Sequence, residues 1–450
     1  MSDTPRFPTP LEEKVSALDE AMLAKGLGVF LSSIDFRSAA LLNSCVHCGL
    51  CADSCHYSLT IDDEKSLPAY KVGLIEKVFK RYATYMGRNF PTWVGAHDFD
   101  EKMVREWIDS LYGRCSMCGR CTIGCTIGLN VPSLVGAARG ALAAMDLVPP
   151  GLQSTVDKAV TTGNNMGIPT QDWLETVDWL QEELQTAVGD PSARLPIDKE
   201  GARFLYTANP REPAFFPLSL IAAGKIFYAA GENWTLPSEH YDLTNYGLFS
   251  GDIGAARTIA ERLVKTMERL GTKTLVIGEC GHGFAANRWE GPEWLQKEYG
   301  FEVKSILEIV AGYIRDRRIK LDPSRNTKRV TLHDPCNLVR HGGIVEEQRY
   351  ILRHAVSDFV EMTPNREKNF CCGGGGGQLA MSCFTDRRKS AGGVKAEQIK
   401  QTEAKIVAPC HNCIDQLTEL NKHFKLGVEV RTVCEVTANA LVLPAVFRFS

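Results

Sequence analysis

The sequence has no hydrophobic run long enough to cross a membrane. Its longest stretch without a charged residue runs from Cys121 to Ala138, and glycine, asparagine and proline interrupt it. A spanning helix needs about 20 predominantly apolar residues in a row. The N-terminal stretch MSDTPRFPTPLEEK is polar and lacks the apolar core of a secretory signal. We therefore expect a cytoplasmic protein with no transmembrane span of its own.

Two further features are missing. The formal net charge is −3, and no stripe of lysine and arginine rises above the background, which argues against a nucleic-acid partner. The one glycine-rich run, CCGGGGG, does not follow the G-x-G-x-x-G pattern of a dinucleotide site after a strand. We expect neither flavin nor nicotinamide to bind.

What the chain has in excess is cysteine, with 16 in 450 residues. Without a secretory signal, a disulfide framework is the wrong explanation for so many cysteines, and metal sites are the better one. The length and the 44% hydrophobic content allow two or three domains with real cores.

The first eight cysteines form two runs with the same spacing. CVHCGLCADSC and CSMCGRCTIGC both read C-x2-C-x2-C-x3-C. This spacing is typical of two-cluster ferredoxins, in which the fourth cysteine of each run ligates the other cluster. Zinc ribbons use two cysteine pairs with a longer loop between them, so a third cysteine at this spacing has no tetrahedral role. We predict two [4Fe-4S] cubanes, held by Cys45, Cys48, Cys51 and Cys125 (cluster 1) and by Cys115, Cys118, Cys121 and Cys55 (cluster 2).

The segment between the two runs, AYKVGLIEKVFKRYATYMG, has helical periodicity. We therefore predict an all-α, ferredoxin-like two-cluster domain at 41–146 that conducts electrons between its partners. A helical extension at 1–40 is expected to precede it. A helical linker is expected at 147–201, and one of its faces carries Trp173, Val177, Leu180 and Leu184.

From residue 202 onward, short apolar stretches alternate with helical ones, and the pattern repeats. VKSILEIVAGY matches VRTVCEVTANA, and LVIGECGHG matches IVAPCHNC, at offsets of 127 to 130 residues. We predict an α/β domain made of two pseudo-symmetric halves, 202–326 and 327–450. Its cysteines follow strands, where ligands gather in open α/β sheets.

Five cysteines of the second half form a set that exceeds the four thiolates needed to hold a cubane. They are Cys336, Cys371, Cys372, Cys410 and Cys413. The glycines after the vicinal pair would let a bulky group approach the backbone. In the first half Asn209 stands opposite Cys336 and Gly283 opposite Cys413, so Cys280 is left alone there.

These motifs resemble the CCG domain of the heterodisulfide reductase family. The whole arrangement resembles the heterodisulfide-reductase-D-like subunits of sulfate-reducer membrane complexes, such as the Dsr and Tmc complexes. The resemblance implies one noncubane [4Fe-4S] cluster on the five cysteines of the second half, with the backbone of Gly373, Gly374 and Gly375 around it. It implies no second noncubane cluster in the first half.

The same resemblance implies a function. The chain would be the iron-sulfur subunit of an anaerobic redox complex, peripheral on the inner face of the cytoplasmic membrane. Its expected partners are an integral-membrane cytochrome b-type subunit, other subunits of the complex and a DsrC-like sulfur-carrier protein, whose disulfide or trisulfide it would cleave or form. Cys280 and His282 in GECGHG are the candidate catalytic residues, Cys280 as a transient sulfur partner and His282 as a proton donor; their plainer interpretations are a buried cysteine and polar packing.

Other interpretations stay open. The chain could be an electron-relay subunit without sulfur chemistry, as in glycolate oxidase or anaerobic glycerol-3-phosphate dehydrogenase complexes, or a scaffold with structural clusters. Cys383 and Cys434 are predicted to be packed in the protein interior. His333, Asp334 and His411 flank predicted ligands and are expected to tune the cluster or to form turns.

Overall fold

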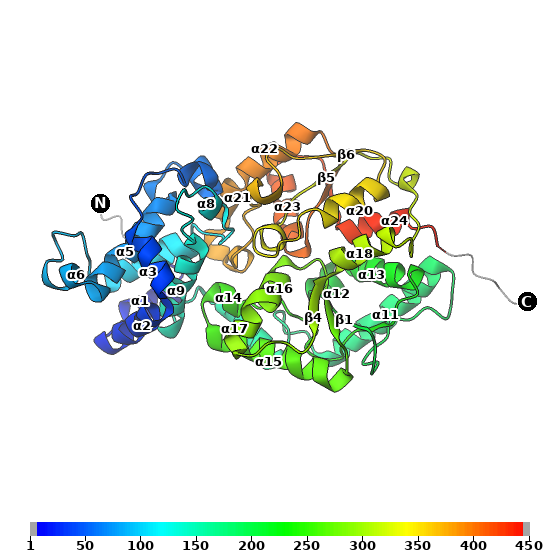
Figure 1. Ribbon diagram of the computed structural model, residues 1–450, viewed down its shortest axis with the longest axis horizontal. Coiled ribbons are helices and arrows are strands. Elements are labelled where there is room, and N and C mark those ends of the chain that lie inside the picture. Colours follow the sequence, from blue (N-terminus) through cyan, green and yellow to red (C-terminus); the bar gives the residue numbers. More distant parts are fainter. Residues whose placement is uncertain (1–6, 444–450) are drawn as a thin grey trace, which may run out of the picture. The chain divides into compact units, whose positions relative to one another are not determined.

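The computed structural model describes residues 7–443, which fall into two compact units (Figure 1). Residues 1–6 and 444–450, the outer ends of the predicted extension and of the second half, lie outside the described part. The first unit comprises Met1–Val156, Tyr246–Gly254 and Phe370–Glu397. The second comprises Asp157–Asn245, Ala255–Asn369 and Gln398–Ser450. The predicted domain boundaries remain predictions.

The described residues of the first unit form helices and loops and contain no β-strand. Its α-helices are α1 (Thr9–Ser16), α2 (Glu20–Ser33), α3 (Phe36–Asn43), α4 (His56–Thr60), α5 (Pro68–Ala83), α6 (Tyr85–Asn89), α7 (Glu101–Trp107), α8 (Arg120–Ile123), α9 (Val131–Ala144), α14 (Gly247–Ser250) and α21 (Thr385–Ala391). Short 3-10 or π turns are η1 (Ala52–Ser54), η2 (Glu64–Ser66), η3 (Ile108–Tyr112), η7 (Gln378–Ala380) and η8 (Ser382–Phe384). Three of the boundaries between the units fall within helices, namely α10 (Pro150–Thr162), α15 (Ile253–Leu270) and α22 (Gly393–Thr402).

An aromatic core holds the helices of the first unit together. The fully buried Trp107 packs edge-on against Phe30 of α2, with ring centroids 5.2 Å apart, and against Phe99 at 4.9 Å. Helix α2 begins at Asp19, whose carboxylate caps the amide of Met22 at 2.7 Å. As predicted, the segment between the cysteine runs is helical and forms α5 and α6.

The second unit contains two four-stranded parallel sheets with the same topology, β2-β1-β3-β4 and β6-β5-β7-β8. The first sheet contains β1 (Phe204–Thr207), β2 (Trp234–Thr235), β3 (Thr274–Ile277) and β4 (Glu302–Ser305). The second contains β5 (Val330–Leu332), β6 (Phe359–Val360), β7 (Ile406–Ala408) and β8 (Glu429–Val430). The central strands are buried apolar runs, as expected when helices cover both faces of a parallel sheet.

Helices connect these strands. They are α11 (Thr170–Val188), α12 (Arg211–Phe215), α13 (Pro217–Ala229), α15 (Ile253–Leu270), α16 (Gly281–Ala285), α17 (Gly291–Leu295), α18 (Ile306–Arg315), α19 (Cys336–Val339), α20 (Glu347–Ala355), α23 (His411–Phe424) and α24 (Val433–Ala440). Short turns are η4 (Ala286–Glu290), η5 (Pro323–Arg325) and η6 (Arg366–Lys368). The predicted apolar face of α11 is buried at all four positions.

The internal repeat extends to the details of helix capping. Ser305 with Glu308 starts α18, and Thr432 with Glu435 starts α24, each as a complete capping box. The two sheets and their matched caps agree with the predicted pair of α/β halves. Within residues 7–443, no helix is both long and apolar enough to cross a membrane.

Candidate metal centres

The cysteines predicted for cluster 1 lie close together in the first unit. Burial raises the pKa of the Cys51 thiol, and charge on Cys45 and Cys125 would raise it further. The pKa of Cys45 is likewise raised by burial and by its neighbours Cys125 and Cys48. Cys125 belongs to the second run in the sequence, so the chain crosses over as the two-cluster spacing requires.

The cysteines predicted for cluster 2 surround a small, mostly apolar pocket, also within the first unit. Cys55, Cys115, Cys118 and Cys121 all line it. Burial raises the pKa of Cys121 well above its ordinary value, and the other three thiols add to that rise. No disulfide joins any two cysteines within residues 7–443, so none of these sulfurs is excluded as a thiolate donor. Four soft donors around one cavity suit an iron-sulfur cluster.

The two sets differ in the charges around them. Lys71 and Arg114, both buried, line the cavity of the second set, and the Lys71 ammonium donates to the carbonyl of Ser66 at 2.8 Å. Burial raises the pKa of Cys115, whereas Lys71 and Arg139 oppose that rise. The first set lies near a carboxylate instead: the negative charge of Glu76 raises the pKa of Cys45.

The segment with the vicinal cysteines belongs to the first unit and packs on the ferredoxin-like helices, with α21 against α4 (Figure 1). The Ser116 hydroxyl donates to Cys371 Sγ at 3.5 Å, and the Gly373 amide donates to the same sulfur at 3.3 Å. Cys371 and Cys372 are both buried. Cys371 therefore contacts the side chain of Ser116, the residue that directly follows Cys115.

The structure gives a local reason for the later glycines of the run. Gly376 has a φ of +62°, and a Cβ there would lie 2.6 Å from the backbone carbon of Ser116. Gly377 has a φ of +82°, and its Cβ would lie 2.9 Å from the side chain of Leu152. Both positions need glycine for conformation and for space. The predicted role of Gly373, Gly374 and Gly375 as a cradle for a cluster remains a prediction.

In the second unit, Cys336, Cys410 and Cys413 follow the strands at the centre of the second sheet. Cys336 begins α19 after β5, and Cys410 precedes α23 after β7. The sulfurs of Cys410 and Cys413 lie 3.6 Å apart, and the hydrogen bond between them lowers the pKa of Cys410. The five cysteines predicted for the noncubane cluster thus belong to two units, three here and two in the first.

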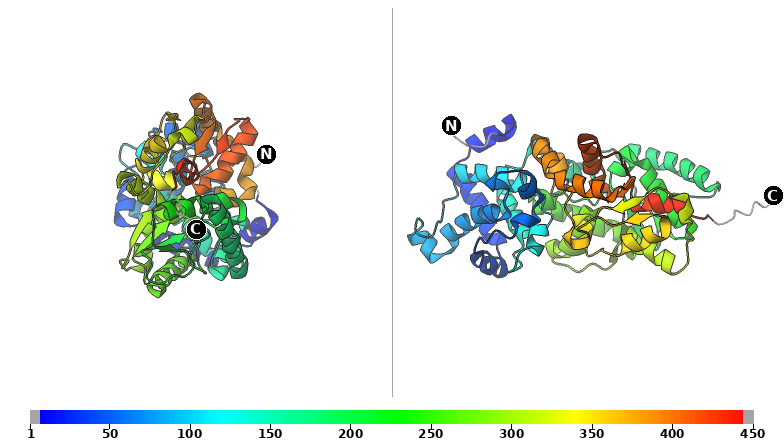
Figure 2. Two further views of the ribbon diagram at one scale, coloured as in Figure 1. Left: turned by 90° about the vertical axis from the view of Figure 1, so that its right-hand side faces the viewer. Right: turned by 90° about the horizontal axis from the view of Figure 1, so that it is seen from above.

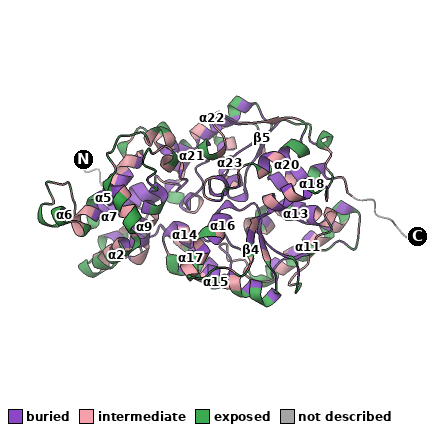
Figure 3. Ribbon diagram, in the orientation of Figure 1, coloured by how far each residue is buried: buried purple, intermediate pink, exposed green. Residues whose placement is uncertain are grey.

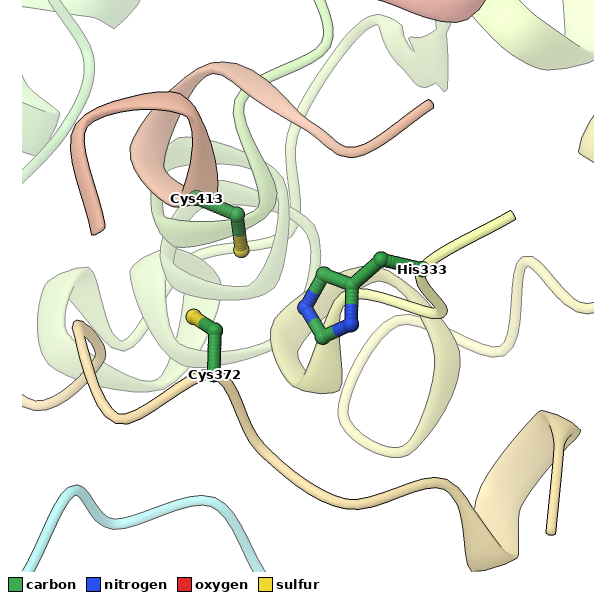
Figure 4. Close-up of side chains that lie close together, drawn as sticks. All are labelled: His333, Cys372 and Cys413. Atoms are coloured by element: carbon green, nitrogen blue, oxygen red, sulfur yellow. The ribbon is translucent and has the colours of Figure 1, made fainter. Parts of the chain in front are cut away.

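His333 was expected only to flank a ligand, but its position makes it a further candidate ligand. A ring nitrogen of His333 lies within 4.8 Å of Cys413 Sγ. Figure 4 shows the ring in the loop after β5 and the sulfur on the first turn of α23, turned toward one another; it also labels Cys372, which belongs to the first unit.

A buried ion pair fixes the loop between β5 and α19. The Arg349 guanidinium donates to both oxygens of Asp334 at 2.7 Å, and both side chains are fully buried. The Arg366 amide donates to the same carboxylate at 2.7 Å. Bidentate pairs of this kind set geometry strictly, so Asp334 positions the residues that lead into Cys336.

Polar side chains fill the place of the missing cysteines in the first half. The sulfur of Cys280 accepts hydrogen bonds from Asn412 at 3.2 Å, from the Gly283 amide at 3.3 Å and from Asn209 at 3.7 Å. A Cβ at Gly283 would lie 2.8 Å from the carbonyl oxygen of Leu243, so no cysteine fits there. These contacts favour the expectation that the first half holds no noncubane cluster.

The two candidate catalytic residues are buried in the second unit. Burial raises the pKa of Cys280 to about 11 and lowers the pKa of His282 to about 4, although a hydrogen bond with Asn412 opposes the latter shift. Both residues thus contact Asn412, which lies between Cys410 and Cys413 in the sequence. Their catalytic roles remain predictions.

Two buried carboxyl groups in this half of the second unit, those of Glu212 and Glu279, were not predicted from the sequence. Glu212 Oε1 accepts from the amide of Asn209 at 2.8 Å and lies 3.4 Å from His411 Nε2, whereas no described residue bonds its Oε2. Glu279 accepts from the amides of Val433 and Cys434 at 3.0 and 2.6 Å. Burial raises the pKa of Glu212 to about 8 and of Glu279 to about 7, so near neutral pH Glu212 is mostly protonated and Glu279 is about half protonated.

The raised pKa of Glu212 predicts a pH-dependent stability. The folded state binds a proton that the unfolded state has released between about pH 4.5 and pH 8, so stability falls as the pH rises through that window. Because Glu279, Glu435 and His411 lie near Glu212 and titrate with it, we expect the free energy of unfolding to fall by on the order of 3 kcal/mol across this window. The Glu212→Gln variant should lose less than the wild type does, as measured by thermal unfolding from pH 5.5 to 8.5.

The exposed Glu261→Gln on α15 serves as the control and should follow the wild type at every pH. Parallel curves for Glu212→Gln and wild type would show that Glu212 is ionised throughout this range.

The two remaining cysteines differ. Cys434 is buried, as predicted. The prediction that Cys383 is packed is wrong, because it is exposed in η8. Its position in the 3-10 turn directs its side chain outward.

Comparison with known proteins matches both cysteine-rich regions. The family described as "4Fe-4S dicluster domain" matches residues 41–129, which hold all eight cysteines of the two runs. The family described as CCG, "Cysteine-rich domain", matches residues 330–418, which hold all five cysteines predicted for the noncubane cluster.

Similar proteins align along most of the chain. The chain is 29% identical over 457 residues to the "Hdr-like menaquinol oxidoreductase iron-sulfur subunit" of Archaeoglobus profundus, covering 90% of this chain and 80% of that protein. The corresponding iron-sulfur subunit 2 of Archaeoglobus fulgidus is also 29% identical, over 455 residues, with the same coverage. The D subunit of the dihydromethanophenazine:CoB--CoM heterodisulfide reductase of Methanosarcina barkeri is 27% identical over 408 residues, covering 89% of this chain and 94% of that protein.

Proposed function

We propose, from the premise that the chain is a heterodisulfide-reductase-D-like CCG iron-sulfur protein and an oxidoreductase, that it exchanges electrons between a membrane partner and a thiol substrate. The reaction would reduce or form a disulfide or trisulfide, with a DsrC-like sulfur-carrier protein as the substrate. The chain would lie on the inner face of the cytoplasmic membrane, beside a cytochrome b-type subunit and the other subunits of its complex.

The cysteines would hold three clusters. The first set would be Cys45, Cys48, Cys51 and Cys125; the second Cys115, Cys118, Cys121 and Cys55; and the third Cys336, Cys371, Cys372, Cys410 and Cys413. When bound, two cubanes would supply one-electron relay, and a noncubane [4Fe-4S] cluster would supply the two one-electron steps of sulfur-sulfur cleavage.

The observation that carries this proposal is the contact between Ser116 and Cys371. Ser116 follows Cys115 directly, and its hydroxyl donates to Cys371 Sγ at 3.5 Å. The Gln378 amide also donates to the carbonyl of Cys115, at 3.1 Å. The segment with the vicinal cysteines thus packs on the ferredoxin-like part of the first unit. A CCG region that worked independently of the cubanes would not need these contacts.

The charges suggest a direction for electron movement. Lys71 and Arg139 lower the pKa of Cys115 and so stabilise added negative charge near the second set, whereas Glu76, which pairs with Lys80, raises the pKa of Cys45 in the first set. We therefore expect electrons to move from the Cys45 side toward the Cys371 side when a disulfide is reduced.

Reduction of a disulfide consumes two electrons and two protons and yields two thiols. Near neutral pH the buried carboxyl group of Glu212 in α12 is mostly protonated, and that of Glu279, which directly precedes Cys280, is about half protonated. Glu212 contacts His411, the residue after Cys410. These groups are the candidates for proton supply.

The proposal is tested with the full, iron-loaded chain, reduced methyl viologen as the electron donor and a two-cysteine peptide in its disulfide form as the probe. We expect two viologen radicals to be oxidised for each disulfide opened, with free thiols appearing in step, and no turnover by Cys371→Ser. Viologen oxidation that requires a quinone analogue and releases no thiol would instead support an electron-relay subunit.

A further inference from the structure

The turn after α5 exposes a group of large apolar side chains. We call residues 84–97 the α6 hairpin, which projects from the other helices of the first unit (Figures 1 and 2). Its exposed fractions are 73% for Tyr85, 38% for Met86, 49% for Phe90 and 81% for Trp93. Figure 3 shows α6 largely in the colour of exposed residues. A cluster of exposed aromatic residues is unusual on a surface that faces only water.

Hydrogen bonds fix the shape of this hairpin. Thr84 caps α6 through the amide of Gly87 at 3.0 Å, and the His97 amide closes the base by donating to the carbonyl of Lys77 at 3.1 Å. Phe90 and Trp93 pack edge-on with their ring centroids 6.3 Å apart. The exposed aromatic side chains are therefore held outward by an ordered backbone.

A Cβ on Gly87 would lie 1.8 Å from the carbonyl oxygen of Lys80, so α6 approaches the end of α5 too closely for any other residue at this position. Glycine here allows the tight corner that turns Tyr85 and Met86 away from the helices.

Cations outnumber carboxylates in and beside this hairpin. Residues 77–97 contain Lys77, Lys80, Arg81 and Arg88 and no aspartate or glutamate, in a chain whose net charge is −3. Lys80 pairs with Glu76, and Arg81 pairs with Asp98 at 2.6 Å, so Lys77 and Arg88 are the cations of this range without an ion pair among the described residues. Arg88 is exposed within the hairpin itself, and Arg81 donates to the carbonyl of Arg88 at 3.3 Å. The segment is therefore basic and aromatic at once.

We propose that the α6 hairpin inserts its aromatic side chains into the headgroup region of an anionic phospholipid membrane. Tryptophan and tyrosine favour that region because their rings are apolar at one end and polar at the other. Lysine and arginine beside them attract anionic headgroups, and shallow insertion of an apolar face adds to that attraction. The hairpin gives the chain a membrane contact that needs no spanning helix and no partner subunit.

The test uses the full, iron-loaded chain and co-sedimentation with vesicles. Vesicles of phosphatidylglycerol and phosphatidylcholine in equal parts are compared with pure phosphatidylcholine. We expect the wild type to bind the anionic vesicles and to be released by salt, and the double variant Phe90→Ser, Trp93→Ser to bind on the order of tenfold more weakly. Arg88→Glu should weaken binding and reduce its dependence on salt.

Trp179→Ser is the matched control, because Trp179 is a 48% exposed tryptophan on α11, outside the hairpin. It should bind as the wild type does. Equal binding by the double variant and the wild type, or no binding of the wild type to anionic vesicles, would overturn the proposal. So would binding only to membranes that contain the other subunits of the complex, which would make the hairpin a protein contact. None of these outcomes depends on sulfur chemistry.

Discussion

We expect the Cys410→Ser variant to lose about a third of the iron of the chain and more than a hundredfold of its activity on disulfides. Cys410 is buried, and its hydrogen bond with Cys413 lowers its pKa, which favours the thiolate form that binds metal. A serine hydroxyl stays protonated at neutral pH and therefore does not supply an anionic ligand. If each cluster holds four irons, about four of about twelve irons should be absent.

Two control variants make this result specific. Cys383→Ser changes an exposed cysteine in η8 and should keep all of the iron and activity. Cys125→Ser should also lose iron, but from the first unit. Full iron content and unchanged activity in Cys410→Ser would remove this residue from the proposed ligand set.

The second large effect should come from Arg139, a fully buried arginine of α9 with no carboxylate partner among the described residues. Its guanidinium donates to the carbonyl oxygens of Leu111, Phe249, Gly376 and Cys115, at distances from 2.6 to 3.2 Å. These carbonyls belong to three separate stretches of the first unit. Arg139→Met leaves four buried acceptors without their donor, so we expect a loss on the order of 4 kcal/mol in the stability of that unit.

Hydrogen exchange on the full chain measures this loss where it occurs. Amides of residues 105–145, 246–254 and 370–397 should exchange much faster in Arg139→Met, and iron should be retained less well. Arg139→Lys should restore little, because an ammonium cannot replace the planar fork of donors. The exposed Arg257→Met on α15 is the control. Unchanged exchange in all three stretches of Arg139→Met would show that Arg139 does not hold them together.

Local spacing and repetition made much of this molecule predictable. The C-x2-C-x2-C-x3-C runs predicted a crossed pairing, and the structure places Cys125 beside Cys45 and Cys55 beside Cys121. The repeat predicted two α/β halves, because equal strand and helix patterns at a constant offset leave few other folds. The buried face of α11 followed from helical periodicity alone.

Contacts between distant residues could not be predicted. Ser116 and Cys371 are 255 positions apart, and neither has a local pattern that names the other. Arg139 did leave a signal, as the single charge within VPSLVGAARGALAA, where small residues let a helix pack on all sides. Glu279 precedes Cys280 directly, yet its raised pKa depends on burial by α24, which begins more than 150 residues later.

Electron paramagnetic resonance on the oxidised, iron-loaded chain titrated with a thiol would test whether sulfur chemistry takes place at Cys336, Cys371, Cys372, Cys410 and Cys413. We expect a paramagnetic signal that requires both oxidation and thiol, disappears in Cys371→Ser and Cys410→Ser, and persists in Cys383→Ser. Signals that arise only on reduction and do not respond to thiol would contradict it and would move the sulfur chemistry to a partner.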